Sequence, residues 1–191
     1  MNSLMNNHDK IIKRMRNSAI SYLARYEVSK FQFKNTMIRK LSGFDNQLHE
    51  ELKIEIVDQI QKEMIASGFI DDKRYAEMQS RSIRRQGGSE RLIFAKLKHN
   101  GITDNIIKNA IEIVDEGNNN AEMIAAINFI KKKNIGVFYK KKFSEEEHDQ
   151  YLLKKKWIGS LSRRGFNLSI INKVLNITDL ANADLILEDP I

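Results

Sequence analysis

The sequence predicts an all-α protein in which tandem three-helix repeats form an elongated or curved array. The only proline, Pro190, is the penultimate residue, so residues 1–189 lack the residue that most strongly breaks helices. Apolar residues recur at spacings of three and four almost throughout, as on one face of a helix. Similar segments also recur along the chain, and three-helix units of this size are stable mainly when they stack on their neighbours.

The predicted repeats are separated by glycines and polar linkers. Gly68, Gly101 and Gly165 each follow a helical pattern, where a glycine can adopt the left-handed conformation that ends a helix. The predicted boundaries are 1–67 for the first repeat with an N-terminal extension, 71–116 for the second, 121–177 for the third, and 178–191 for an acidic C-terminal tail.

The first repeat is predicted from three helix faces. Their apolar residues are spaced three or four apart. The faces are Ile12, Met15, Ala19 and Leu23; Phe33, Met37 and Leu41; and Ile56, Ile60 and Met64.

The second repeat opens with "GFIDDKRYA", in which two aspartates precede a helical pattern. Asp71 is placed to cap that helix, and we expect Tyr75, Met78 and Ser82 to form its inner face. The alternative is that Asp71 and Asp72 form a catalytic or metal-binding pair. Adjacent carboxylates at a helix start point in different directions, and no histidine or third acid lies near them in sequence, so capping is favoured.

Polar residues also mark the starts of later helices. Ser89 is predicted to cap a helix that runs to Gly101, and Thr103 to cap the next, which ends in the linker 116–120. In the third repeat, Ser144 and Glu147 have the spacing of a capping box at the start of a long basic helix. The last predicted helix carries the apolar residues of the segment 170–175.

An internal repeat is visible without gaps. The segment "KLKHNGITDNIIKNAI" (96–111) aligns with "SLSRRGFNLSIINKVL" (160–175), so that Gly101 matches Gly165. A first copy around "KLSGF" (40–44) is less regular, because it is shorter before the glycine and is followed by an insertion.

The composition favours a soluble, cytoplasmic protein. Hydrophobic residues make up 41% and charged residues 30% of the chain, which is enough apolar material for a core. There are no cysteines, which excludes disulfides and thiolate sites. No segment has the length and apolarity of a signal peptide or membrane span, although a basic amphipathic N-terminus also leaves an organelle transit peptide open.

Charge is distributed unevenly along the chain, whose net charge is +7. The segment 131–164 is rich in Lys and Arg, whereas 176–191 contains four acids and no basic residue. This pattern is typical of a polyanion-binding protein, most simply one that binds nucleic acid, with a tail that can compete for the same surface. A solvated helical surface without a partner explains the charge equally well.

The candidate binding residues fall into two basic patches. Tyr75, Phe94 and Trp157 could stack on bases, but their helical spacing favours core positions. The four histidines have no metal-ligand spacing, so no metal or cofactor is predicted. The first patch is Arg74, Arg81, Arg84, Arg85, Arg91 and Lys96, and the second is Lys154, Lys155, Lys156, Arg163 and Arg164, with Lys131, Lys132, Lys133 and Lys140, Lys141, Lys142 nearby in sequence.

Four stretches together make the sequence similar to the RecX family of recombination regulators. They are "YLARYEVSKFQF" (22–33), "GFIDDKRYAEMQSRS" (68–82), "GGSERLIFAKLKHNGI" (87–102) and "WIGSLSRRGFNLSIINKVL" (157–175). The chain departs from the family in having Gln32 and Phe33 where an acidic-leucine pair is usual.

This resemblance implies a non-catalytic, monomeric regulator of the RecA recombinase. Such a protein would bind in the groove of the RecA filament on single-stranded DNA, and contact the DNA through the filament or directly. It would restrain filament extension, strand exchange, ATPase and coprotease functions.

Two other function classes fit the sequence less well. A stand-alone DNA-binding regulator would use residues 89–116 as a helix-turn-helix, but its recognition helix has Lys108 as its only basic residue. An enzyme is disfavoured, because the sequence lacks a phosphate-binding glycine loop, a nucleophile elbow and a clustered acid-base set.

Overall fold

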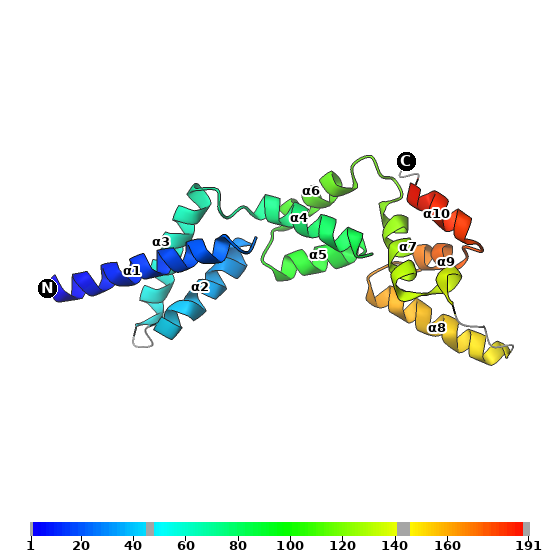
Figure 1. Cartoon of the computed structure of the whole chain (residues 1–191), viewed down its shortest axis with the longest axis horizontal. Helices are drawn as coiled ribbons and strands as arrows, with labels where there is room; N and C mark the ends of the chain where they lie inside the picture. Colours follow the sequence, from blue (N-terminus) through cyan, green and yellow to red (C-terminus); the bar gives the residue numbers. More distant parts are fainter. Residues whose placement is uncertain (1, 45–47, 141–145, 189–191) are drawn as a thin grey trace. The chain divides into compact units, whose positions relative to one another are not determined.

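The computed structural model describes residues 2–44, 48–140 and 146–188, and within them the protein is all-α, as predicted (Figure 1). No helix in these ranges is both long and apolar enough to cross a membrane. The helices are α1 (Asn2–Leu23), α2 (Lys30–Phe44), α3 (Glu50–Ala66), α4 (Asp72–Arg85), α5 (Glu90–His99), α6 (Asp104–Asp115), α7 (Ala121–Lys133), the 3₁₀ helix η1 (Gly136–Phe138), α8 (Glu147–Arg163), α9 (Leu168–Leu175) and α10 (Leu180–Glu188).

The chain divides into two compact units, which are described separately. One contains Met1–Tyr75 and His99–Thr103, and the other contains Ala76–Lys98 and Asp104–Ile191. The predicted boundaries of the three repeats do not coincide with this division and remain a prediction.

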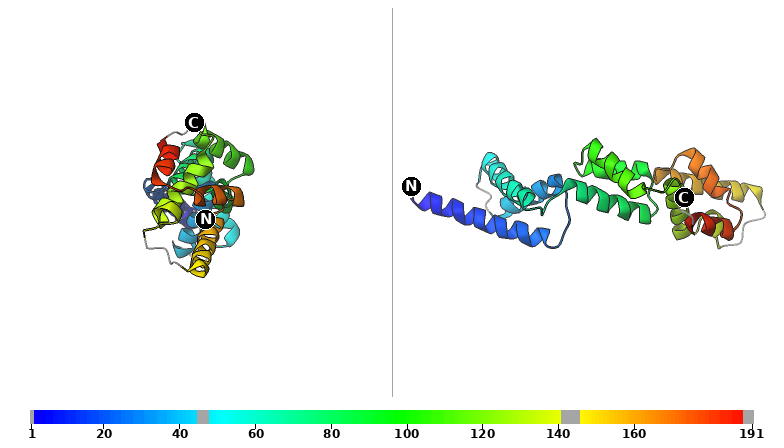
Figure 2. Two further views of the ribbon diagram at one scale, coloured as in Figure 1. Left: turned by 90° about the vertical axis from the view of Figure 1, so that its right-hand side faces the viewer. Right: turned by 90° about the horizontal axis from the view of Figure 1, so that it is seen from above.

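In the first unit, α1, α2 and α3 pack side by side around one apolar core (Figure 1, Figure 2). Their predicted inner faces are confirmed, because the central residues of all three are excluded from water. The fully or almost fully buried members include Met15, Ala19, Phe33, Met37, Leu41, Ile56, Ile60 and Met64.

The turn between α3 and α4 has the predicted chemistry. Gly68 has a φ of 72°, the left-handed conformation that glycine adopts without a steric penalty. Asp71 Oδ1 accepts hydrogen bonds from the backbone N–H groups of Lys73 and Arg74, at 2.8 and 3.2 Å. Asp71 therefore caps α4, as expected.

The inner face of α4 differs from the prediction. Tyr75 is buried, but Met78 is 39% exposed and Ser82 is only half-buried. The buried positions that follow Tyr75 are Ala76, Ser80 and Ile83, so the helix is rotated relative to the expected orientation.

The second unit contains a separate core formed by α7, η1, α8, α9 and α10. Within this core α7 contacts α9 and α10, and α8 contacts α9. The core includes Ile127, Ile130, Leu161, Ile171 and Val174. Ile171 and Val174 belong to the apolar segment 170–175 that was predicted as a helix.

Several predictions for this part of the chain were wrong. The helix predicted to be last is followed by α10, whose Ala183 is fully buried in the same core. In addition, α8 begins at Glu147 with Glu146 in the N-cap position, not with the predicted Ser144, which lies outside the described residues.

Candidate nucleic-acid interface

The carboxylates of Asp71 and Asp72 both accept hydrogen bonds from the backbone. Asp71 is used in the helix cap, and Asp72 Oδ1 accepts a hydrogen bond from the backbone N–H of Lys30 at 2.9 Å. Among the described residues, no group of three or more His, Cys, Asp or Glu side chains could hold a metal ion. Both aspartates therefore stabilise the fold.

Arg74, predicted in the first patch, makes local contacts within the first unit. Its guanidinium binds the Glu27 carboxylate, with 3.0 Å between Nε and Oε1. It also donates to the carbonyl oxygens of Gly68 and Phe69 at 3.1 and 3.2 Å. These bonds hold the loop before α4, and they leave Arg74 less available to a partner than its sequence position suggested.

Arg84 is the most strongly bound of the predicted arginines. Its side chain is only 10% exposed and forms ion pairs with Asp115 and Glu122, the latter with 2.6 Å between Nη1 and Oε2. Nη1 also donates to the Gly88 carbonyl. Burial acts to lower the pKa of Arg84, but the hydrogen bonds to the two carboxylates outweigh burial and raise it. The charge of Arg84 is therefore neutralised inside the protein.

The guanidinium of Arg164 is also held by contacts within the protein. Its guanidinium donates to the carbonyl oxygens of Gly87 and Gln86, at 3.0 and 2.8 Å. The same group lies 5.5 Å from the centre of the Phe129 ring, within the range of a cation–π interaction. Arg164 thus joins the turn after α8 to the turn after α4.

The other basic residues of α4 and α5 are exposed. Arg81 pairs with Glu77 one helical turn away, at 3.2 Å, and such exposed pairs are weak. Arg85, Arg91 and Lys96 are exposed and form no ion pair within the described part of the chain. These three side chains can interact with a polyanion without breaking internal bonds.

The other predicted cations lie mainly on α7 and α8. Lys131 pairs with Asp184 of α10 at 3.2 Å, with both side chains about half exposed. Lys140 is exposed, and Lys141 and Lys142 lie outside the described residues. Six further cations are exposed and make no ion pair with a described residue: Lys132, Lys133, Lys154, Lys155, Lys156 and Arg163.

Of the aromatic residues considered for stacking, Tyr75 is buried, whereas Phe94 and Trp157 are half-buried. Tyr75 is buried, its hydroxyl accepts a hydrogen bond from Asn100, and burial raises the pKa of its phenol. Trp157 packs edge-on against Tyr139, with 5.2 Å between ring centres. Sequence reasoning missed Tyr151, which is 63% exposed on α8, one turn before Lys155. Its aromatic character beside three lysines was the available signal.

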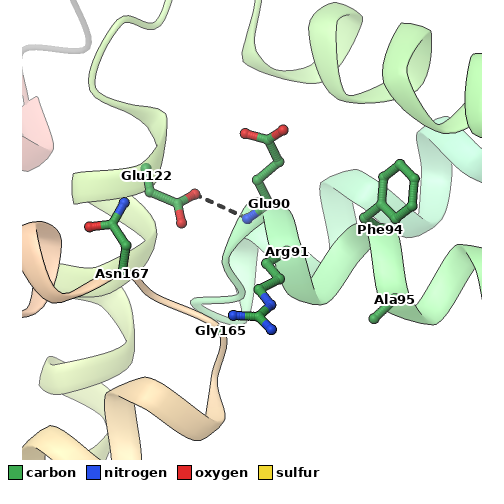
Figure 3. Close-up of a pocket in the computed structure, with 7 residues that line it drawn as sticks. All are labelled: Glu90, Arg91, Phe94, Ala95, Glu122, Gly165 and Asn167. Atoms are coloured by element: carbon green, nitrogen blue, oxygen red, sulfur yellow. Dashed lines mark hydrogen bonds between the residues drawn. The ribbon is translucent and has the colours of Figure 1, made fainter.

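A pocket of about 520 Å³ lies within the second unit, where the start of α5 faces the turn before α9 (Figure 3). The Glu122 carboxylate closes one side by accepting a hydrogen bond from the backbone N–H of Glu90, at 3.0 Å. Arg91 contributes a cation that forms no ion pair among the described residues. Phe94 contributes a half-buried aromatic ring. Cationic and aromatic groups are the combination that single-stranded nucleic acids contact.

Helix α6 has few features of a base-reading helix. Ile107, Ala110 and Ile111 are buried, and Lys108 is the only basic residue in the helix. Direct readout in the major groove requires several donors or acceptors on the exposed face. The geometry therefore does not favour the helix-turn-helix alternative.

Comparison with known proteins gives a consistent result. No family model matches the chain. A protein of Myxococcus xanthus (strain DK1622) named regulatory protein RecX is 27% identical over 165 residues, which cover 85% of this chain and 84% of that protein. A protein of the same name from Mycobacterium sp. (strain JLS) is 24% identical over 123 residues, which cover 64% of this chain and 63% of its own length.

Two solved structures share the fold. The crystal structure of RecX from Lactobacillus salivarius has a TM-score of 0.59 at 21% identity, covering 93% of this chain and 99% of its own. A second crystal structure, of a regulatory protein RecX, has a TM-score of 0.60 at 18% identity and covers 88% of this chain and 73% of its own.

The fold and the exposed cations define a helical-repeat protein with a basic surface. The sequence relatives indicate a more specific class, because they are all named regulatory protein RecX and the first of them matches 85% of the chain. The chain is similar over most of its length to a protein named regulatory protein RecX, and it shares the fold of two RecX crystal structures.

Proposed function

We propose that this protein is a non-catalytic inhibitor of the RecA recombinase that binds in the groove of the RecA filament on single-stranded DNA. It restrains filament extension, strand exchange, ATPase and coprotease activity. Its role would be in the cytoplasm, in homologous recombination, DNA repair and the SOS response. The naming of the relatives as regulatory proteins supports the regulatory part of the proposal.

The main observation that supports binding to a polyanion is the set of exposed lysines on α8. Lys154, Lys155 and Lys156 are exposed without an ion pair in the described part of the chain. Each such cation that neutralises a phosphate releases a counterion, which favours binding at low salt. Arg85, Arg91 and Lys96 extend the available charge to α4 and α5.

Tandem repeats are suited to a repeating partner. We also propose that the repeats have the boundaries 1–67, 71–116 and 121–177, with the acidic segment 178–191 following the third repeat. Several weak contacts made by linked units add through effective concentration, so no single contact needs to be strong. A monomer that presents several units would therefore bind a filament more tightly than one unit alone.

The test is the ATPase rate of RecA filaments on single-stranded DNA at fixed salt, measured with increasing amounts of the protein. The wild-type chain should lower the rate, and the triple variant Lys154→Glu, Lys155→Glu, Lys156→Glu should require at least tenfold more protein for the same inhibition. The matched control carries Lys10→Glu, Lys13→Glu and Lys62→Glu, which change the net charge equally at exposed positions of α1 and α3. An ATPase rate that stays constant across the whole titration with wild-type protein would refute the proposal.

A further inference from the structure

A second depression, of about 400 Å³, lies on the surface of α4 and α6. It is lined by Met78, Arg81, Arg84, Arg85 and Val114, all within the second unit. Met78, Arg81 and Arg85 share one face of α4 because they are spaced three and four residues apart. Met78 was predicted to face inward, but it lies on this exposed face beside the two arginines.

The depression is lined by three arginines, of which one is left without an internal carboxylate. Arg84 is fully compensated by Asp115 and Glu122. Arg81 has only the exposed pair with Glu77, and Arg85 forms no ion pair with any described residue. The rim can therefore accept at least one additional carboxylate without displacing a buried one.

Apolar side chains complete the lining. Met78 is 39% exposed, and Val114 of α6 is partly buried. A methionine adapts to irregular partner surfaces, and Met and Arg are both enriched in the centres of protein interfaces. A phosphate backbone gains little from a thioether, whereas an aliphatic side chain of a protein partner gains the free energy of burial.

We propose that this depression docks an acidic protein segment with one apolar anchor side chain, and that the protein component of the filament supplies this segment. The anchor would contact Met78 and Val114, and its neighbouring carboxylates would bind Arg85 and Arg81. The depression then contacts protein, whereas the lysines of α8 contact nucleic acid. This inference rests on the proposed function, because it assigns the partner of one part of that surface.

The test measures two affinities separately at the same salt concentration. One probe is purified RecA from the same host without DNA, and the other is a fluorescein-labelled oligothymidine. Met78→Gln removes the apolar contact without changing the charge, and Arg85→Gln removes the unpaired cation. The control is Ile54→Gln on α3, because Ile54 is 40% exposed and lies outside the depression.

Both depression variants should weaken RecA binding at least tenfold, and should keep oligothymidine binding within twofold of the wild type. Ile54→Gln should leave both affinities within twofold. The inference is overturned if folded Met78→Gln binds RecA like the wild type, or if the variants lose affinity mainly for the oligothymidine, which would make the occupant a nucleic acid. Wild-type protein that inhibits the filament ATPase but does not bind DNA-free RecA would overturn this inference alone, whereas wild-type protein that neither binds RecA nor inhibits the filament ATPase would refute the proposed function as well.

Discussion

The side chain of Ser89 donates a hydrogen bond to the carbonyl oxygen of Arg164, with 2.8 Å between Oγ and O. Ser89 Oγ also accepts from the backbone N–H of Leu92 and so caps α5. Ser29 has the same two roles in the first unit, because its Oγ accepts from Gln32 N and donates to the carbonyl oxygen of Asn100 at 2.7 Å. In both places one serine caps a helix and satisfies the carbonyl that precedes a left-handed glycine.

Gly165→Ala should be strongly destabilising for this reason. Gly165 has a φ of 94°, and a Cβ there would collide with Ser89 Oγ. Gly117 has a φ of 71°, but a Cβ added there would meet nothing within 4 Å, so Gly117→Ala carries only the backbone strain, about 1 kcal/mol. We expect Gly165→Ala to lower the free energy of unfolding by at least about 1 kcal/mol more than Gly117→Ala, since overpacking adds roughly 1–3 kcal/mol. Urea unfolding followed by circular dichroism measures both, and equal losses would contradict the steric account.

Much of the fold could be predicted because its signals are local. The spacing of Phe33, Met37 and Leu41 determines one buried face of α2, and the glycines that end helices adopt the left-handed conformation that glycine favours. The orientation of α4 could not be predicted in this way. Met78 is apolar and Ser80 is polar, yet Ser80 is buried and Met78 is 39% exposed, because neighbouring helices decide which face is covered.

The candidate site was less predictable, because contacts between residues far apart in the sequence decide which of its arginines are bound internally and which are exposed. Arg84 bonds to residues 31 and 38 positions away, and Arg164 to residues 77 and 78 positions away. Local spacing cannot distinguish these internal arginines from the exposed Arg85. The acidic composition of the C-terminal segment indicated a tail, whereas the burial of Ala183 shows that α10 is part of the core.

Ser80→Ala should increase stability. Ser80 is fully buried on α4, and its Oγ has no hydrogen-bond partner among the described residues. Removing a buried, unsatisfied hydroxyl relieves its desolvation cost, and alanine has the higher helix propensity, so we expect a gain of about 1 kcal/mol in the free energy of unfolding.

The matched control for this change is Ser42→Ala on α2, because Ser42 Oγ donates to the Ile38 carbonyl at 3.1 Å. That substitution removes a satisfied hydroxyl and should be nearly neutral. A loss of stability in Ser80→Ala, measured by urea unfolding, would mean that the hydroxyl is satisfied in solution.

Acid should weaken the first unit through Arg16 and Glu63. The two side chains form a bidentate pair between α1 and α3, with both N–O distances 2.7 Å. The hydrogen bond from Arg16 lowers the pKa of Glu63 below its usual value. This contribution is therefore complete above the unfolded-state pKa of about 4.3 and is lost as the pH falls through the lower folded-state pKa. Both side chains are more than a third exposed, so the effect should stay below about 1 kcal/mol.

The measurement compares wild type with Glu63→Gln by urea unfolding at pH 7 and pH 3. The variant should be less stable than the wild type at pH 7, and the difference should become smaller at pH 3. A difference that is independent of pH would show that the charge of Glu63 does not contribute.

Arg84→Met should be the most destabilising of the single arginine substitutions in the second unit. It leaves the carboxylates of Asp115 and Glu122 without their shared cation, and these side chains are only 20% and 28% exposed. Removing one partner of a buried ion pair costs about 3–5 kcal/mol, and partial exposure of the acids should place this loss near the lower limit. Arg85→Met is the matched control, because Arg85 is exposed and forms no ion pair with a described residue, and it should change the free energy of unfolding by no more than about 0.5 kcal/mol. Thermal unfolding of the two variants at pH 7 separates an internal role for Arg84 from a binding role, since a purely binding arginine would leave the melting temperature unchanged.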